Sequence, residues 1–308
     1  MPKPNLGRTL AIANPAAHGG RGAAAAERLH RFFASRSPFS TCYEYHLTAA
    51  RGDGEQAARK SAGYDTVIVL GGDGIIHEVA NGLMQIGRDG RPALAIIPFG
   101  SGNDFARTLG IPFNNVEAAL ARLADSEKSA IDVGRVNGTY FLETLSFGLD
   151  AAIALDTTDK RTRGTDEMGE QLYVTSGIKY MMSHSKGYAC TFSFDGGPER
   201  HIRSLIFAIQ NGPTYGGGFR ICPHASPTDG LLDICYNVKL PTTPHMLLLF
   251  ALARFGKHTG SSALAFARAA HIEIEYDEGG IPCQADGEEI LGRRFAVDLL
   301  RAELDIYR

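Results

Sequence analysis

The 308-residue sequence predicts an N-terminal doubly wound α/β domain over residues 1–126, followed by a mostly β domain over residues 127–308. The length favours two domains, because single cores rarely exceed about 250–300 residues. Strand-like and helix-like segments alternate up to about Ser126, which is typical of a parallel sheet covered by helices. Beyond that residue strand-like segments dominate, which is typical of an antiparallel sandwich or barrel. A return of the last few residues to the first domain stays open.

Composition excludes several classes of protein. Hydrophobic residues make up 44% and charged residues 21%, an ordinary globular balance, and the net charge of −3 argues against a dedicated nucleic-acid binder. The five scattered cysteines form no C-x-x-C pair, so neither a disulfide framework nor a zinc site is supported. No signal peptide is evident, and the longest apolar stretch, Met246 to Ala253, is too short to span a bilayer. We therefore expect a cytoplasmic protein, peripheral to the membrane, that binds no nucleic acid.

The first domain is predicted from repeated strand-helix units. Thr66 to Leu70 is the clearest strand, because it is β-branched and apolar on both faces, as in sheets covered on both sides. Ile75, Ile76, Val79 and Leu83 then recur at helical spacing. The predicted strands are 9–14, 41–47, 66–70 and 93–98, and the predicted helices are 23–33, 53–62, 75–84, 105–109 and 116–124.

The second domain is predicted from strands with long connections. The predicted strands are 133–136, 139–146, 188–194, 204–210, 231–237, 271–276 and 295–299, and two helices are predicted at 169–183 and 244–254. The polar stretch 157–169 contains Lys160, Arg161 and Arg163, and is interpreted as a solvated mobile loop, with contact to anionic headgroups as the alternative. Helix 244–254 is expected to pack against a sheet, with insertion into a membrane interface as the alternative.

A glycine-rich turn follows the third predicted strand. Gly71, Gly72, Asp73 and Gly74 stand between this strand and a helix, where ligands bind in open α/β sheets. Glycines there let main-chain N–H groups approach a phosphate. A carboxylate would repel phosphate, so Asp73 fits a bound metal ion that the phosphates also bind. The alternative is a tight turn with an N-capping aspartate.

A second turn of the same kind follows the next strand. Residues 100–106 read G-S-G-N-D-F-A, and neighbouring parallel strands place both turns at one edge of the sheet. The two turns therefore predict a cradle for polyphosphate and magnesium, in which the Ser101 hydroxyl donates to a phosphate. Either Asn103 or Asp104 is expected to cap the following helix.

These motifs together resemble the catalytic domain of diacylglycerol kinases and related lipid kinases. The superfamily also includes sphingosine kinases and, distantly, NAD kinases. The resemblance runs in order through nearly the whole chain. The matching segments are Asn14-Pro15, the G-G-D-G turn, Glu78-Val79-x-Asn81-Gly82, P-F-G-S-G-N-D-F-A, Asn211-Gly212, Gly216 to Gly218, Cys222-Pro223, Asp229 to Asp233 and Asp286-Gly287-Glu288.

The resemblance implies an ATP site between an α/β domain and a β-sandwich domain. The residues that it assigns to ATP are Asn14, Thr48, Gly71, Gly72, Asp73, Gly74 and Ser101. It implies that Asp73 and Asp104 help to place a catalytic Mg²⁺ and that Glu288 is the catalytic base. It further implies a structural Mg²⁺ held by Asp229 and by the backbone carbonyls of Ser226 and Leu231.

The local patterns at two of these positions also permit simpler structures. Asp286 to Glu289 alone is typical of a solvated acidic hairpin turn, and only the resemblance favours a base at Glu288. Pro227 to Gly230 is good turn chemistry without a metal, and Thr228 stands where many relatives carry another acid or Asn.

Two residues beside the first turn depart from the family pattern. Ile75 replaces the usual Thr after G-G-D-G, and His77 replaces the usual Asn before the Glu. Sphingosine kinases resemble this chain at both positions, so the departures affect the expected substrate class more than activity. His77 is expected to support the loop rather than to contact ATP.

We therefore expect an ATP- and Mg²⁺-dependent kinase that phosphorylates a hydroxyl of diacylglycerol or a related lipid. One alternative is a superfamily kinase acting on a sphingoid base, another lipid alcohol or a soluble alcohol. The other is a nucleotide-binding regulatory protein with little turnover. Transient peripheral contact with a membrane is expected, and a homodimer stays open.

Overall fold

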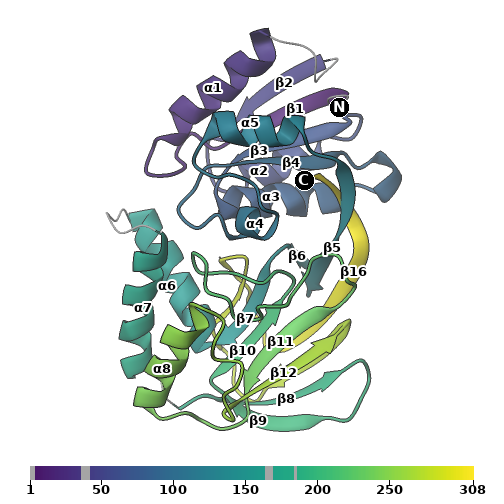
Figure 1. Ribbon diagram of the computed structural model, residues 1–308. Coiled ribbons are helices and arrows are strands. Elements are labelled where there is room, and N and C mark those ends of the chain that lie inside the picture. Colours follow the sequence, from purple (N-terminus) through teal and green to yellow (C-terminus); the bar gives the residue numbers. More distant parts are fainter. Residues whose placement is uncertain (1–3, 36–41, 164–168, 184–185) are drawn as a thin grey trace. The chain divides into compact units, whose positions relative to one another are not determined.

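The computed structural model describes residues 4–35, 42–163, 169–183 and 186–308 (Figure 1). Its internal contacts divide the chain into two compact units. Unit 1 contains residues 1–131 and 302–308, and unit 2 contains residues 132–301. The first predicted boundary lay a few residues earlier, at 126/127.

Unit 1 is built around a parallel sheet. Its strand order is β2-β1-β3-β4, and the end of β16 adds a further parallel neighbour, with Ile306 beside Leu94. All six residues of β3 and all six of β4 are buried, which agrees with a sheet covered on both faces. The strands are β1 (Arg8–Ala13), β2 (Cys42–Leu47), β3 (Thr66–Gly71) and β4 (Ala93–Pro98).

Helices between the strands supply the two covering layers of unit 1. Leu29 of α1 and Leu120 of α5 pack with Ile68 and Ile97 of the sheet in one core. The elements are α1 (Gly22–Ser35), α2 (Asp53–Arg59), α3 (Asp73–Met84), the short 3₁₀ helix η1 (Arg88–Gly90), α4 (Asp104–Thr108) and α5 (Val116–Ala124).

Unit 2 is a sandwich of two antiparallel sheets. One has the order β16-β13-β8-β9, with β5 paired to β16 and to β6, and the other has the order β12-β11-β10-β7-β14-β15. Phe147 and Phe207 from one sheet pack with Phe192 and Phe295 from the other in a single buried core. The strands are β5 (Lys128–Val136), β6 (Thr139–Phe141), β7 (Thr144–Gly148), β8 (Tyr188–Phe194), β9 (Arg200–Ser204), β10 (Ile206–Gln210), β11 (Leu232–Asn237), β12 (Leu264–Ala269), β13 (His271–Tyr276), β14 (Cys283–Ala285), β15 (Glu288–Glu289) and β16 (Arg294–Tyr307).

Among the described residues of unit 2 the helices are α6 (Leu149–Arg163), α7 (Gly169–Ser183) and α8 (Thr243–Ala253). They lie side by side in Figure 1. Leu149 of α6, Tyr173 of α7 and Met246 of α8 share a second, separate apolar cluster of this unit.

The predicted fold class is confirmed, and the second unit is a sandwich rather than a barrel. The interpretation of 157–169 as a mobile loop is wrong over its described part, because α6 continues to Arg163. Ion pairs at helical spacing, Asp156 with Lys160 and Asp159 with Arg163, stabilise this polar end. Residues 164–168 lie outside the described part of the chain.

Several strand predictions also need correction. The predicted strand 139–146 is divided between β6 and β7, β9 and β12 were not predicted, and β16 extends well beyond 295–299. The division has a physical cause, since the Asp286 carboxylate accepts the amides of Leu142, Glu143 and Thr144 there.

Candidate functional site

The residues assigned to ATP gather at one edge of the unit 1 sheet. Thr48 follows β2, Asn14 follows β1, the first glycine turn follows β3, and Ser101 lies in the turn after β4. The four strands are parallel neighbours, so their carboxyl ends meet at the same edge. Two hydrogen bonds hold this edge together, from the Asn14 amide to the Leu70 carbonyl at 3.0 Å and from the Thr48 amide to the Ala13 carbonyl at 2.9 Å.

The two glycine turns contact each other through their backbones. A Cβ atom on Gly100 would lie only 2.4 Å from the Gly72 Cα atom, and one on Gly72 would lie 3.1 Å from the Gly100 Cα atom. Any side chain at either position would separate the turns. Glycine is therefore required here by close approach, and the turns form one continuous main-chain surface, as phosphate binding needs.

Two carboxylates converge beside this surface. A Cβ on Gly102 would lie 2.7 Å from Asp73 Oδ2 and 3.3 Å from Asp104 Oδ2. Asp73 Oδ2 also accepts the Asn103 amide at 2.7 Å, which joins the first turn to the second. Carboxylate oxygens are the ligands that Mg²⁺ prefers, so Asp73 and Asp104 would suit a magnesium ion at this edge. Arg107 Nε also lies 4.0 Å from Asp104 Oδ1.

Neither helix of this edge is capped by a side-chain hydrogen bond. Asn103 stands at the N-cap of α4 with φ +55°, but its amide group donates to the Gly100 carbonyl at 2.7 Å. Asp104 is the first residue of the helix. Asn103 therefore holds the expected N-cap position of α4, but its side chain braces the turn instead of accepting an amide of the helix.

Two residues that the sequence did not single out brace the same turn. Asn114 Oδ1 accepts the Gly100 amide at 3.0 Å, and His18 Nδ1 lies 3.0 Å from the Gly100 carbonyl. Because that carbonyl only accepts, His18 Nδ1 carries the proton. Both partners are distant in sequence, so no local pattern could have found them.

The two departures from the family pattern have structural explanations. Ile75 is buried and fills the space left by glycine, since Cβ atoms on Gly54 and Gly71 would lie 2.3 and 2.4 Å from its methyl groups. His77 is also buried, and the Asn81 side chain lies 3.2 Å from its Nε2 atom. Both residues therefore support α3 from within unit 1.

Glu78 has a role that sequence reasoning missed. Its two carboxylate oxygens accept the amides of Gly52 and Gly54 at 2.9 and 3.1 Å. A carboxylate on these amides stabilises the N-terminus of α2. The motif containing Glu78 therefore fixes α2 against α3.

In unit 2, Glu288 begins the short strand β15 and is half-buried, while its neighbour Glu289 is exposed. Asp286, at φ +50°, makes the turn into this strand and is occupied by the three amides described above. The hairpin expected from Asp-Gly is present. Asp286 is a structural residue, which leaves Glu288 as the candidate base of the hairpin, a role that stays a prediction.

The assigned structural metal site contains a cation from the protein itself. Arg268 on β12 donates to Asp229 Oδ2 and lies 3.4 Å from Asp233 Oδ2. The other oxygen of Asp229 accepts the Leu231 amide at 3.2 Å, as in an ordinary turn. Within the described residues there is no cluster of three or more metal-ligating side chains. The Asp229 carboxylate is therefore occupied by a guanidinium and an amide, and a metal role for Ser226, Asp229 and Leu231 stays a prediction.

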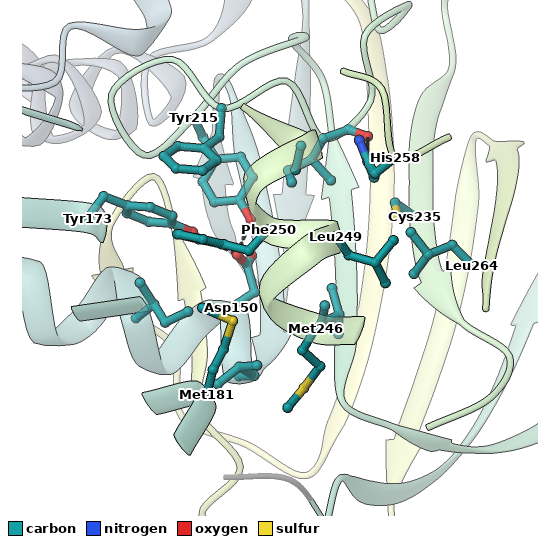
Figure 2. Close-up of a pocket in the computed structure, with 16 residues that line it drawn as sticks. Asp150, Tyr173, Met181, Tyr215, Cys235, Met246, Leu249, Phe250, His258 and Leu264 are labelled. Atoms are coloured by element: carbon teal, nitrogen blue, oxygen red, sulfur yellow. Dashed lines mark hydrogen bonds between the residues drawn. The ribbon is translucent and has the colours of Figure 1, made fainter. Parts of the chain in front are cut away.

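An apolar cavity of about 60 Å³ lies within unit 2, between α6, α7, α8 and the sandwich (Figure 2). Its walls are almost wholly apolar. Met181, Met246, Leu249 and Phe250 line it from the helices. Such a lining suits an aliphatic group.

One acidic group, Asp150, lies in this apolar cavity. It is buried in the first turn of α6, and the hydroxyls of Tyr173 and Tyr215 both donate to its Oδ1 atom (Figure 2). Burial raises the pKa of Asp150, and hydrogen bonds from Tyr215, Ser146 and Tyr173 oppose the rise. The pKa of Tyr215 is raised well above its usual value by burial and by the Asp150 charge.

His258 lines the same cavity, and burial lowers its pKa below the usual value. Its Nε2 atom lies 3.0 Å from the Ile221 carbonyl. The sequence did not single out either His258 or Asp150. Only the preference of acids for the first helical turn could have drawn attention to Asp150.

The two units define a class of fold, in which a parallel α/β unit with paired glycine turns occurs in one chain with a β-sandwich unit. Sequence comparison then identifies the family. Residues 8–136 match the diacylglycerol kinase catalytic domain, and residues 143–303 match the YegS C-terminal NAD kinase beta sandwich-like domain. The chain belongs to this family of lipid kinases.

Individual relatives agree with this assignment. A protein of Pseudomonas aeruginosa named "Probable lipid kinase YegS-like" is 35% identical over 77% of this chain and 75% of its own length. A diacylglycerol kinase of Bacillus subtilis is 29% identical over 79% of this chain and 78% of its own length.

Solved structures agree as well. A crystal structure of a diacylglycerol kinase from Bacillus anthracis superposes with a TM-score of 0.76 and 26% identity, covering 97% of this chain and 96% of that one. Yeast NADH kinase has a TM-score of 0.50 and 12% identity, over 98% of this chain and 83% of that one, a likeness of fold alone. None of the described helices is both long and apolar enough to cross a membrane.

Proposed function

We propose that the chain transfers the γ-phosphate of ATP to a hydroxyl of diacylglycerol or a closely related lipid. Membership of the family supplies the reaction class, and the acceptor is our inference. The observation that carries it is the apolar cavity of unit 2, because a soluble acceptor would need a polar lining.

In this proposal the glycine turns of unit 1 bind the nucleotide. Main-chain N–H groups of Gly71 to Gly74 and the Ser101 hydroxyl face the phosphates, and Asn14 and Thr48 complete the edge. Asp73 and Asp104 hold a Mg²⁺, which when bound neutralises phosphate charge. The bracing of Gly100 by Asn103, Asn114 and His18 keeps the two turns in contact, so the amides are oriented before ATP arrives.

Glu288 supplies the acceptor side. A carboxylate within hydrogen-bond reach of the lipid hydroxyl accepts its proton as the oxygen attacks the γ-phosphorus. Half burial at the start of β15 leaves Glu288 accessible to substrate while the Asp286 turn fixes its backbone.

The cavity takes the beginning of an aliphatic chain. Its volume equals that of about two water molecules in the liquid, so a longer chain requires side chains to move. Met181 and Met246 are suited to this, because unbranched thioether side chains change rotamer easily.

A second candidate acceptor is a lipid with an additional hydrogen-bond donor, such as a sphingoid base. The specific observation that favours it is Asp150, an acid inside an otherwise apolar cavity. An ammonium or second hydroxyl on the substrate would satisfy this acid, whereas the ester-linked chains of diacylglycerol offer no donor.

Transfer of labelled phosphate from γ-labelled ATP into lipids in mixed micelles tests the proposal. The panel contains diacylglycerol, monoacylglycerol, ceramide, sphingosine and phosphatidylglycerol, with NAD as a soluble control. We expect labelled diacylglycerol, loss of label with Glu288→Gln, and retention with the matched variant Glu289→Gln.

Other results have defined meanings. Labelled sphingosine would show that the acceptor is a sphingoid base rather than diacylglycerol, and labelled NAD would refute a lipid acceptor. Transfer that survives Glu288→Gln would refute Glu288 as the base. ATP binding without any labelled product would favour the regulatory alternative.

A further inference from the structure

Helix α8 is apolar on both its inner and its outer sides. Met246 and Leu249 are buried against the cavity, yet Leu247 and Leu248 on the same helix are 38% and 55% exposed. A surface helix normally turns a polar side to solvent. The outer side of α8 therefore lacks the polar side chains that a helix facing only water would normally carry.

Exposed apolar side chains continue from α8 onto its neighbours. Ile178 and Met182 of α7 are 44% and 75% exposed, Leu240 before α8 is 41% exposed, and Phe255 after it is 68% exposed. Contacts join these segments. A Cβ on Gly177 of α7 would lie 2.6 Å from the Phe250 ring of α8, and one on Gly187 would lie 3.1 Å from Leu240. We call these six residues, Ile178, Met182, Leu240, Leu247, Leu248 and Phe255, the α7–α8 face.

The two segments that carry the α7–α8 face contain basic side chains and no acidic ones. Residues 171–194 and 238–272 contain no Asp or Glu, although the whole chain has more acidic than basic residues. Lys186, Lys239 and Lys257 are exposed in these two segments, and none of the three makes an ion pair with the described residues. An apolar face bordered by lysines is complementary to an anionic lipid surface.

We propose that the α7–α8 face docks on a bilayer containing anionic phospholipid, with α8 lying in the interface as the wall between bilayer and cavity. This inference rests on the proposed lipid acceptor, which resides in a bilayer. The 11 residues of α8 are too few to span, so the helix lies on the membrane. Leu247 and Leu248 enter the lipid while Met246 and Leu249 face the cavity, so an acyl chain passes only one layer of side chains.

The absence of tryptophan from the sequence gives a direct depth measurement. Leu248→Trp introduces a single fluorophore on the α7–α8 face, and Leu291→Trp introduces one at an 81% exposed leucine after β15, at the other end of the sheet from β12. The full chain is mixed with vesicles of phosphatidylcholine and phosphatidylglycerol, without ATP. We expect a blue shift, and quenching by brominated lipid, for Leu248→Trp and neither for Leu291→Trp.

Co-sedimentation with the same vesicles measures the two contributions separately. Lys239→Gln and Lys257→Gln should each weaken binding about fivefold at low salt, and pure phosphatidylcholine should bind weakly. Leu247→Ser and Leu248→Ser should each weaken it about tenfold. Transfer to a short-chain, monomeric lipid should be unchanged by the two lysine substitutions.

The docking proposal fails if both tryptophan variants respond alike or if the leucine substitutions leave vesicle binding intact. It also fails if Leu248→Ser converts a dimer into a monomer by sedimentation velocity, because the face then covers a second copy. The kinase proposal is tested separately. Vesicle binding that depends on the α7–α8 face, without phosphate transfer to any lipid, would support docking and refute the lipid kinase. Phosphate transfer to a lipid in micelles, together with vesicle binding that does not depend on the α7–α8 face, would support the lipid kinase and refute docking.

Discussion

The glycine-turn edge of unit 1 and the cavity of unit 2 are built by opposite means. The edge consists of main chain, and a Cβ at Gly100 would lie 2.4 Å from the Gly72 Cα atom. The cavity consists of side chains from α6, α7, α8, β10 and β11, which converge from distant parts of the sequence. A main-chain site recognises a group that all its substrates share, which in our proposal is phosphate. A site made of side chains can change its substrate preference when those side chains are substituted. We therefore expect the edge to tolerate few substitutions, and substitutions in the cavity to change the preferred substrate.

The largest effect should come from the paired carboxylates at the edge. Asp73→Asn removes one of the two charges beside Gly102 while leaving an oxygen for the Asn103 amide. Phosphate transfer should fall at least about 100-fold with little change in melting temperature. Steady-state kinetics measures the loss, and the exposed Asp89→Asn is the matched control. An active Asp73→Asn variant would show that the edge does not perform the chemistry.

A smaller loss should follow from a single methyl group between the glycine turns. Gly100→Ala places a Cβ against the Gly72 backbone, which cannot move aside like a flexible side chain. We expect the free energy of unfolding to fall by about 2 kcal/mol and ATP affinity to weaken. Gly87→Ala, which meets nothing within 4 Å, should change the free energy of unfolding by less than about 0.5 kcal/mol. Equal stability in urea titrations of both variants would refute the close approach of the turns.

Substitutions in the cavity should change preference rather than abolish transfer. Ala253→Leu narrows the cavity and Met246→Ala widens it, so the preferred acyl chain should shorten in the first and lengthen in the second. The value of kcat/KM should fall about fourfold for each acyl-chain methylene that no longer fits in the cavity. Ala24→Leu, on an exposed position of α1, is the matched control for kcat/KM across a chain-length series. An unchanged series would show that the cavity does not bind the chain.

The smallest effect concerns pH. Burial lowers the pKa of His258 in the folded chain. As the pH falls below about 6.5, His258 therefore binds a proton in the unfolded chain before it does so in the folded chain. The contribution of His258 to stability is therefore complete above about pH 6.5 and decreases as the pH falls towards the lowered pKa. The melting temperature of His258→Gln should fall less than that of the unmodified chain over this range. His271 has the opposite effect on stability as the pH falls, because its hydrogen bond to Asp298 raises its pKa. This effect is the same in the His258→Gln variant and in the unmodified chain, so it does not change the comparison between them. A steeper fall in the variant would contradict the assignment.

The same contrast explains what the sequence could predict. The strand Thr66 to Leu70 and the glycine turn after it are consecutive in sequence, so their pattern predicted the parallel sheet, which is confirmed, and a phosphate site at its edge, which stays a prediction. By contrast, the roles of Glu78 and Asn114 depend on amides 14 to 26 residues away, at Gly52, Gly54 and Gly100, and had no local signal.

Within unit 2, the polar composition of 157–163 favoured a loop, although Asp156-Lys160 and Asp159-Arg163 have the spacing of helical ion pairs and could have predicted α6. The cavity was beyond prediction for a different reason. Its apolar lining residues are the types that fill any core, and only the packing of three helices leaves space between them.

Photochemical labelling with a diacylglycerol that carries a diazirine on its acyl chain tests most directly whether the cavity of unit 2 binds the acyl chain. The lipid is incubated with the full chain, irradiated, and the attachment sites are mapped by peptide mass spectrometry. We predict labels on cavity residues such as Met181, Met246 and Leu249, lost when unlabelled diacylglycerol competes. Competed labels confined to residues 1–131, with none on α6, α7 or α8, would contradict the account.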